Sequence, residues 1–154
     1  ATRGVEKKRS ISDVGADYVI ATDENKLAES VMELTGGSGA DLILDPIGGP
    51  ILSELADAAA PLATIVEYGA LDEEPTPFPL FPALAKGLTV RGYTIFETSK
   101  DPARLKKATD FINARLRTRA LFPLIDRVFT LSEIRQAHKY MASNQQMGKI
   151  VVTA

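Results

Sequence analysis

Apolar residues along the chain follow two different periods, one typical of buried strands and the other typical of helices. Short runs rich in branched side chains predict strands at residues 18–21, 41–45, 63–68, 89–95, 124–129 and 149–153. Residues 42–44 are a continuous apolar run, which predicts a strand covered on both faces. Helical segments separate these runs, and such alternation is typical of a parallel sheet with crossover helices.

The helical segments are marked by apolar stripes and by residues that favour helix ends. Leu27, Val31 and Leu34 lie at i, i+4 and i+7, and Gly36-Gly37 ends this helix. Four prolines between residues 75 and 82 predict a loop or an interrupted start of a short helix. Further helices are predicted after Pro50, from Asp101-Pro102, and after Ser132 as a cap, the last with Ile134, Ala137, His138 and Met141 on its apolar stripe. We expect His138 to be packed there as a structural residue.

The element order is that of the later part of a doubly wound α/β fold, in which ligands bind at the carboxyl ends of the strands. Three loops follow predicted strands: residues 45–49 (Asp-Pro-Ile-Gly-Gly), residues 69–71 (Gly-Ala-Leu) and residues 96–97 (Phe-Glu). Glycines in the first two would let a flat ligand approach the backbone, and Gly48-Gly49 would equally suit a plain turn. The phosphate-binding pattern G-x-G-x-x-G is absent from the chain.

Composition narrows the functional classes. The chain has 154 residues, a net charge of -2 and a pI near 5.5, so it offers no electrostatic case for nucleic acid or for an anionic membrane. It has no cysteine and a single histidine, and we therefore predict no metal site within it. No apolar run approaches the length of a membrane span and no signal-peptide pattern occurs, which favours a cytoplasmic location.

The first residues bear on coenzyme choice. The chain opens directly into a charged, helix-like stretch, and we expect it to begin inside a fold, after a first strand and its glycine-rich turn. Where an NAD site would carry an acidic residue, this chain has Thr2-Arg3-Gly4 and then Lys7-Lys8-Arg9. These cations would suit a 2′-phosphate, as in NADP, although the residues alone favour a solvated basic helix face.

Six segments in the same order resemble the medium-chain dehydrogenase/reductase superfamily, and within it the zinc-type alcohol dehydrogenase and quinone oxidoreductase-like group. The resemblance covers residues 2–152. The segments are Gly15-Ala16-Asp17-Tyr18-Val19-Ile20, Leu34-Thr35-Gly36-Gly37, Asp41 to Gly49, Tyr68-Gly69-Ala70, Gly87-Leu88-Thr89-Val90-Arg91-Gly92-Tyr93 and Gly148-Lys149-Ile150-Val151-Val152.

This resemblance implies a Rossmann-like, doubly wound parallel sheet that lacks its first strand. It assigns residues 1–119 to an NAD(P)-binding domain, truncated at its N-terminus, and residues 120–154 to a segment that returns to a catalytic domain. The implied cofactor-binding residues are Thr2, Arg3 and Lys7 at the 2′-phosphate, Asp45, Pro46, Ile47 and Gly48 at the ribose and adenine, Tyr68, Gly69, Ala70 and Phe96 nearer the nicotinamide, and Gly148 and Lys149 in a closing turn. Thr22 stands where quinone oxidoreductases often have a tyrosine near the adenosine phosphate, which leaves NADP or NAD open.

The function implied is the cofactor-binding portion of an oxidoreductase that passes hydride from NADPH to a quinone, an enone or a related carbonyl or alcohol substrate. Substrate contacts and any proton donor would lie in the other half of the protein, so no catalytic residue is assigned. Zinc would be held only by that other half, and quinone oxidoreductase-like members commonly lack it. The resemblance also implies a homodimer through an edge strand at residues 89–95. A non-catalytic dimerisation module and a free-standing nucleotide-binding domain are the alternatives.

Overall fold

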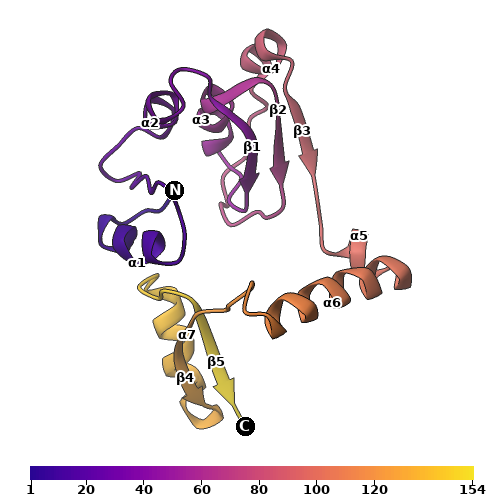
Figure 1. Ribbon diagram of the computed structural model, residues 1–154. Coiled ribbons are helices and arrows are strands. Elements are labelled where there is room, and N and C mark those ends of the chain that lie inside the picture. Colours follow the sequence, from indigo (N-terminus) through magenta and orange to yellow (C-terminus); the bar gives the residue numbers. More distant parts are fainter. The chain divides into compact units, whose positions relative to one another are not determined.

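The computed structural model describes residues 1–154, and the chain divides into two compact units, Ala1–Asp101 and Pro102–Ala154. Each unit contains its own parallel strands (Figure 1). In chain order, the first unit consists of η1 (Val5–Lys7), α1 (Lys8–Asp13), α2 (Leu27–Leu34), β1 (Ala40–Asp45), α3 (Ile51–Ala58), β2 (Ala59–Glu67), α4 (Leu80–Lys86), β3 (Thr89–Gly92) and α5 (Phe96–Ser99). The second consists of α6 (Pro102–Arg117), β4 (Ile125–Thr130), η2 (Leu131–Glu133), α7 (Ile134–Ala142) and β5 (Lys149–Thr153).

A three-stranded parallel sheet in the order β1-β2-β3 organises the first unit. Helix α3 connects β1 to β2 and helix α4 connects β2 to β3, as the predicted alternation requires (Figure 1). The register places Asp45 beside Glu67 and Glu67 beside Gly92, so all three strands end at the same edge. The predicted α/β fold with parallel strands and crossover helices is confirmed.

The core of this unit lies between α3 and the sheet. Leu52 and Ala56 of α3 pack against Ile65 of β2, and all three are buried. Burial of such side chains is the main stabilising contribution, roughly 1.5–3 kcal/mol for each large one. The prediction that β1 is covered on both faces was wrong for this unit, because Leu42 and Leu44, which alternate with the core-facing residues, are 60% and 61% exposed.

The N-terminal region is joined to the segment before α2 by one short parallel contact. Thr2 bridges to Ala21, with Thr2 N–H donating to the carbonyl of Ile20 at 2.9 Å. The strand predicted at residues 18–21 is thus reduced to a single bridge. Helix α2 begins at Leu27 and ends at Leu34, in agreement with the predicted stripe and the following glycines.

The second unit pairs β4 and β5 in parallel, with η2 and α7 as the crossover. A capping box at Thr130 starts this helical segment, since its side chain and that of Glu133 bond each other's backbone. The predicted cap at Ser132 was therefore wrong by two residues. His138 is exposed, so the predicted packing of this histidine was wrong as well.

Two strand boundaries differ from the sequence expectation. Strand β2 begins at Ala59 rather than at residue 63. Strand β3 ends at Gly92 rather than at residue 95, because the carbonyls of Thr94 and Ile95 accept hydrogen bonds from the turn that starts α5. Helix α6 belongs to the second compact unit, which starts at Pro102. Its assignment to a nucleotide-binding domain that ends at residue 119 stays a prediction. No helix in the structure is both long and apolar enough to traverse a lipid bilayer.

Candidate functional site

The loop after β1 is held in place by the carboxylate of Asp45. This side chain is only 3% exposed, and its two oxygens accept the backbone N–H groups of Ile47 at 2.8 Å and Gly48 at 3.0 Å. Gly48 and Gly49 have φ angles of 69° and 70°, a left-handed conformation that favours glycine. Asp45 thus fixes the local turn, and its oxygens are turned onto the loop itself.

The loop after β2 lies directly against this turn. The N–H groups of Leu71 and Asp72 donate to the carbonyls of Pro46 at 3.3 Å and Ile47 at 2.9 Å. A Cβ atom at Gly69 would lie 2.3 Å from the carbonyl oxygen of Pro46, so only glycine fits at this approach. The two loops therefore form one continuous backbone ledge at the carboxyl ends of β1 and β2, which we call the strand-end ledge (residues 45–49 and 68–72).

The backbone N–H groups at the turn after β1 are bonded within the first unit. Asp45 binds the N–H groups of Ile47 and Gly48, and the N–H of Gly49 donates to the Thr76 hydroxyl at 2.8 Å. The N–H groups of residues 47–49 are therefore satisfied within the protein. We therefore do not expect a phosphate at this turn, because phosphate binding needs clustered N–H donors.

Glu67 adds a second carboxyl group beside Asp45. Burial, the charge of Asp45 and a hydrogen bond to Asp45 together raise the pKa of Glu67 to about 7. Sequence reasoning missed Glu67, although an acidic residue inside the apolar run at 63–68 was a signal that could have drawn attention to it. A carboxyl group with a pKa near neutrality at a strand end is a feature of functional sites.

The basic residues at the N-terminus follow the bridge between Thr2 and Ala21, a part of the first unit that we call the N-terminal corner. The N–H of Thr22 donates to the carbonyl of Thr2 at 2.9 Å. Arg3 and Thr22 therefore come directly after the two residues, Thr2 and Ala21, that form the parallel bridge. Lys7 ends the 3₁₀ helix η1. The structure thus places Arg3 beside the position that departs from the quinone oxidoreductase pattern.

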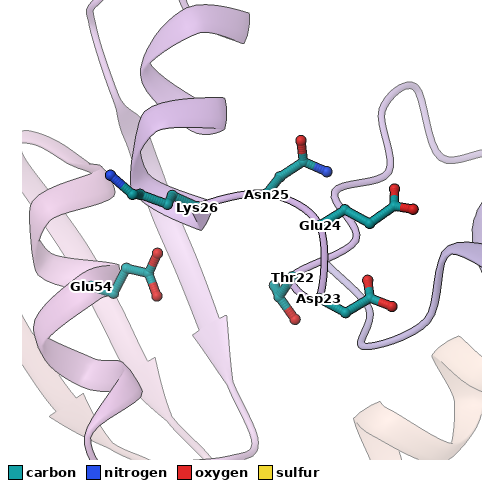
Figure 2. Close-up of a pocket in the computed structure, with 6 residues that line it drawn as sticks. All are labelled: Thr22, Asp23, Glu24, Asn25, Lys26 and Glu54. Carbon is teal, nitrogen blue, oxygen red and sulfur yellow. The ribbon is translucent and has the colours of Figure 1, made fainter.

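A polar cavity of about 350 Å³ follows the same segment and was not anticipated from the sequence. In Figure 2, Glu54 reaches toward it from helix α3, while the other side chains come from the loop before α2. Glu54 accepts the N–H groups of Leu27 at 2.8 Å and Ala28 at 3.4 Å, so it caps α2. The residues that line the cavity are Thr22, Asp23, Glu24, Asn25, Lys26 and Glu54.

The remaining predicted residues are distributed as follows. Tyr68, Gly69 and Ala70 belong to the strand-end ledge, and Tyr68 is half exposed. Phe96 starts α5, is 59% exposed and has the Lys100 ammonium 5.3 Å from its ring centroid.

Gly148 and Lys149 lie in the second unit, at the start of β5. There the N–H of Lys149 donates to the carbonyl of Leu124 at 2.8 Å. A Cβ on Gly148 would approach the same oxygen to 2.5 Å. This glycine therefore allows the close contact between β5 and the start of β4.

Comparison with known proteins identifies the family. The zinc-binding dehydrogenase family pattern matches residues 14–152. The chain belongs to the zinc-binding dehydrogenase family. It corresponds to the C-terminal half of medium-chain dehydrogenase/reductase proteins, and its Rossmann-like fold matches their nucleotide-binding domains. The predicted superfamily and fold class are confirmed.

Individual relatives are similar at low identity. The 2-haloacrylate reductase of a Burkholderia species is 26% identical over 96% of this chain and 45% of its own length. The squalestatin tetraketide synthase of a Phoma species is 25% identical over 100% of this chain and 6% of its own length. The crystal structure of a quinone oxidoreductase of Pseudomonas syringae pv. Tomato DC3000 is 19% identical, with a TM-score of 0.88, and matches 99% of this chain and 47% of that one. The chain thus spans about half of the reductase and a small part of the tetraketide synthase.

The residues present do not fit the zinc ion that the family name implies. The structure brings together no group of three or more histidine, aspartate or glutamate side chains that could hold a metal ion. The chain also has no cysteine. No chemical step is therefore assigned to zinc here.

Proposed function

We propose that this chain is the cofactor-binding portion of an NADPH-dependent oxidoreductase that reduces a quinone, an enone or a related carbonyl compound. The observation that carries the proposal is the strand-end ledge. Its two adjoining loops lie at the carboxyl ends of β1 and β2, and doubly wound folds bind dinucleotides at the carboxyl ends of their strands. The names of the relatives support it, since haloacrylates and quinones both have a carbon–carbon double bond conjugated to a carbonyl or carboxyl group.

The nicotinamide, when bound, supplies the hydride, and the protein orients it. In this proposal Pro46, Ile47 and Gly48 contact the adenosine portion. Asp45 is also placed near the ribose in this proposal, and it fixes the turn that presents these three residues. Tyr68, Gly69 and Ala70 then line the side nearer the nicotinamide.

The preference for NADPH over NADH is proposed to come from the N-terminal corner. Arg3 follows the Thr2 bridge and would pair with a 2′-phosphate, with Lys7 adding positive charge. Asp23 and Glu24, just beyond Thr22, oppose this preference by their charge. The chain's own residues therefore predict a moderate rather than an absolute preference for NADPH.

Titration of the isotope-labelled chain with NADPH, followed by NMR shifts of backbone amides, tests the proposal. Millimolar concentrations are needed, because the chain has no glycine-rich phosphate loop and binding will be weak. The shifts should concentrate on residues 45–49 and 68–70, with a separate group near Arg3. NADH, which lacks the 2′-phosphate, is the control ligand. Arg3→Ala should weaken NADPH binding while leaving NADH binding unchanged. Shifts confined to other surfaces would refute the cofactor site, and equal losses for both coenzymes would refute the role of Arg3.

A second candidate function, assembly of two copies through β3, rests on a separate observation. Strand β3 pairs only with β2, so its other edge has unpaired backbone groups, which are a template for strand pairing. The N–H of Tyr93 donates to the carbonyl of Glu67 on β2, so by alternation the N–H of Gly92 faces the open edge. Gly92→Pro should therefore abolish a dimer detected by light scattering, whereas Gly92→Ala should preserve it. A wild-type chain that is strictly monomeric at high concentration would contradict edge pairing.

A further inference from the structure

Two carboxyl groups meet at the carboxyl ends of β1 and β2, where they face the core side of the sheet. Asp45 and Glu67 are partners in the register, two residues beyond the paired core residues Ile43 and Ile65. Because strand side chains alternate between faces, Asp45 and Glu67 lie on the same side as these isoleucines. Their proximity is a consequence of strand pairing between segments more than twenty residues apart.

The two groups differ in how their oxygens are satisfied. Both oxygens of Asp45 accept backbone N–H groups, from Ile47 and from Gly48. Glu67 is partly buried, and its Oε1 atom is buried without a hydrogen-bond partner in the protein. An ionised carboxylate in this position would be both poorly solvated and repelled by Asp45. A proton on Glu67 removes both penalties and provides an O–H donor for Asp45.

No neighbouring cation relieves this repulsion. Arg91, on β3, is bonded to Glu97 at 2.7 Å, and Lys86, on α4, donates to carbonyls at the end of α3. Of the nearby acids, Glu54 on α3 accepts N–H groups at the start of α2, and Asp72 accepts the N–H of Glu74 at 2.9 Å. The raised pKa of Glu67, about 7, is attributed to burial and to Asp45 alone.

We infer that Glu67 is a positioning residue for the strand-end ledge, and that it acts by sharing a proton with Asp45. The protonated form of Glu67 donates to Asp45 and thereby stabilises the carboxylate that holds Ile47 and Gly48. Loss of this proton leaves two adjacent carboxylates, and the turn at residues 46–48 opens more readily. The consequence for coenzyme binding rests on the proposed function, whereas the consequence for the turn does not.

The direction of the pH dependence follows from the pKa of Glu67. Its value in the folded chain, about 7, lies above the ordinary value of 4.5. The stabilisation is therefore complete below pH 4.5 and is lost as the pH rises through 7. Between pH 5 and pH 8 the folded chain releases a proton that an unfolded chain has already lost, so the turn should become less stable.

Amide hydrogen exchange of the 154-residue chain tests the inference at the turn itself. The protection factors of Ile47 and Gly48 should fall by about tenfold between pH 5 and pH 8. A tenfold change corresponds to roughly one unit of the pKa difference of Glu67, which is less than the full difference because Glu67 is only partly buried. In Glu67→Gln they should stay constant, because the neutral amide donates to Asp45 at every pH. Glu73→Gln removes the same charge from an exposed loop position and should retain the wild-type fall.

A direct titration keeps the inference testable even where a variant does not fold. The carboxyl carbon of Glu67, followed by NMR in the wild-type chain, should titrate near pH 7, and in Asp45→Asn it should titrate closer to its ordinary value. A wild-type midpoint below about pH 5 overturns the inference. An equal fall in protection in wild type and Glu67→Gln also overturns it, because the effect would then belong to another group.

A measurement of coenzyme binding at the two pH values separates this inference from the proposed function. With NADPH as the probe, binding to wild type should weaken between pH 5 and pH 8 more than binding to Glu67→Gln. Failure of NADPH to shift any ledge amide contradicts the proposed function, while the exchange result still decides the role of Glu67. The exchange and titration data therefore test the pairing of protonated Glu67 with the Asp45 carboxylate, independently of coenzyme binding.

Discussion

Gly69→Ala should distort the strand-end ledge, and the size of the effect follows from one contact. The added Cβ would lie 2.3 Å from the carbonyl oxygen of Pro46 and 2.9 Å from its carbonyl carbon. Contacts of Cβ atoms begin at about 3.0 Å, so the two loops must separate by about 0.7 Å. Backbone lies on both sides of this contact, and no flexible side chain is available to move away.

The energetic cost is that of forcing an extra methyl group into a packed site, about 1–3 kcal/mol. Two other glycines provide matched controls for the same substitution. Gly48→Ala meets nothing closer than 3.4 Å but has a φ of 69°, so it should cost only the left-handed backbone strain, roughly 1–2 kcal/mol. Gly92→Ala meets no atom within 4 Å and should be nearly neutral.

Urea unfolding followed by circular dichroism gives the free energy of unfolding for all three variants. Gly69→Ala should lower the free energy of unfolding at least as much as Gly48→Ala does. Gly92→Ala should lower it much less than either. Weakened protection of the amides of Leu71 and Asp72, which bond across the two loops, should accompany Gly69→Ala alone. A Gly69→Ala chain as stable as Gly92→Ala would show that the loops do not pack as described.

Three further substitutions test other parts of the structure. Lys86→Met removes an ammonium group that donates to the carbonyls of Ala56 at 3.0 Å, Asp57 at 2.7 Å and Ala59 at 2.8 Å, and should cost about 2 kcal/mol in urea unfolding. The exposed Lys106→Met is its control, and equal losses would contradict the capping role of Lys86. Leu62→Gly should gain about 0.5 kcal/mol, because Leu62 has a φ of 63° and is 80% exposed, whereas Leu62→Ala retains the strain and should show no gain. Gly148→Ala should lower protection of β4 and β5 amides, since its Cβ would approach the Leu124 oxygen to 2.5 Å, and unchanged protection would refute that close contact.

The alternation of strands and helices, the bounds of some of them and the family were accessible from the sequence alone. Periodicity identifies which residues face a core, and glycines and prolines mark where the chain turns, because these are properties of neighbouring residues. The loop at residues 45–49 was predicted in this way. Its two left-handed glycines show why the chain carries Gly48-Gly49 at this turn.

The roles of Asp45, Glu67 and Lys86 were decided by the tertiary structure. Asp45 was expected near a ribose, and this stays a prediction. In the fold its oxygens hold the turn after β1. Glu67 becomes its neighbour through strand register, and Lys86 reaches the end of α3 about thirty residues away. Such contacts depend on which segments pair in space, and a local pattern of apolar and polar residues carries no information about that pairing.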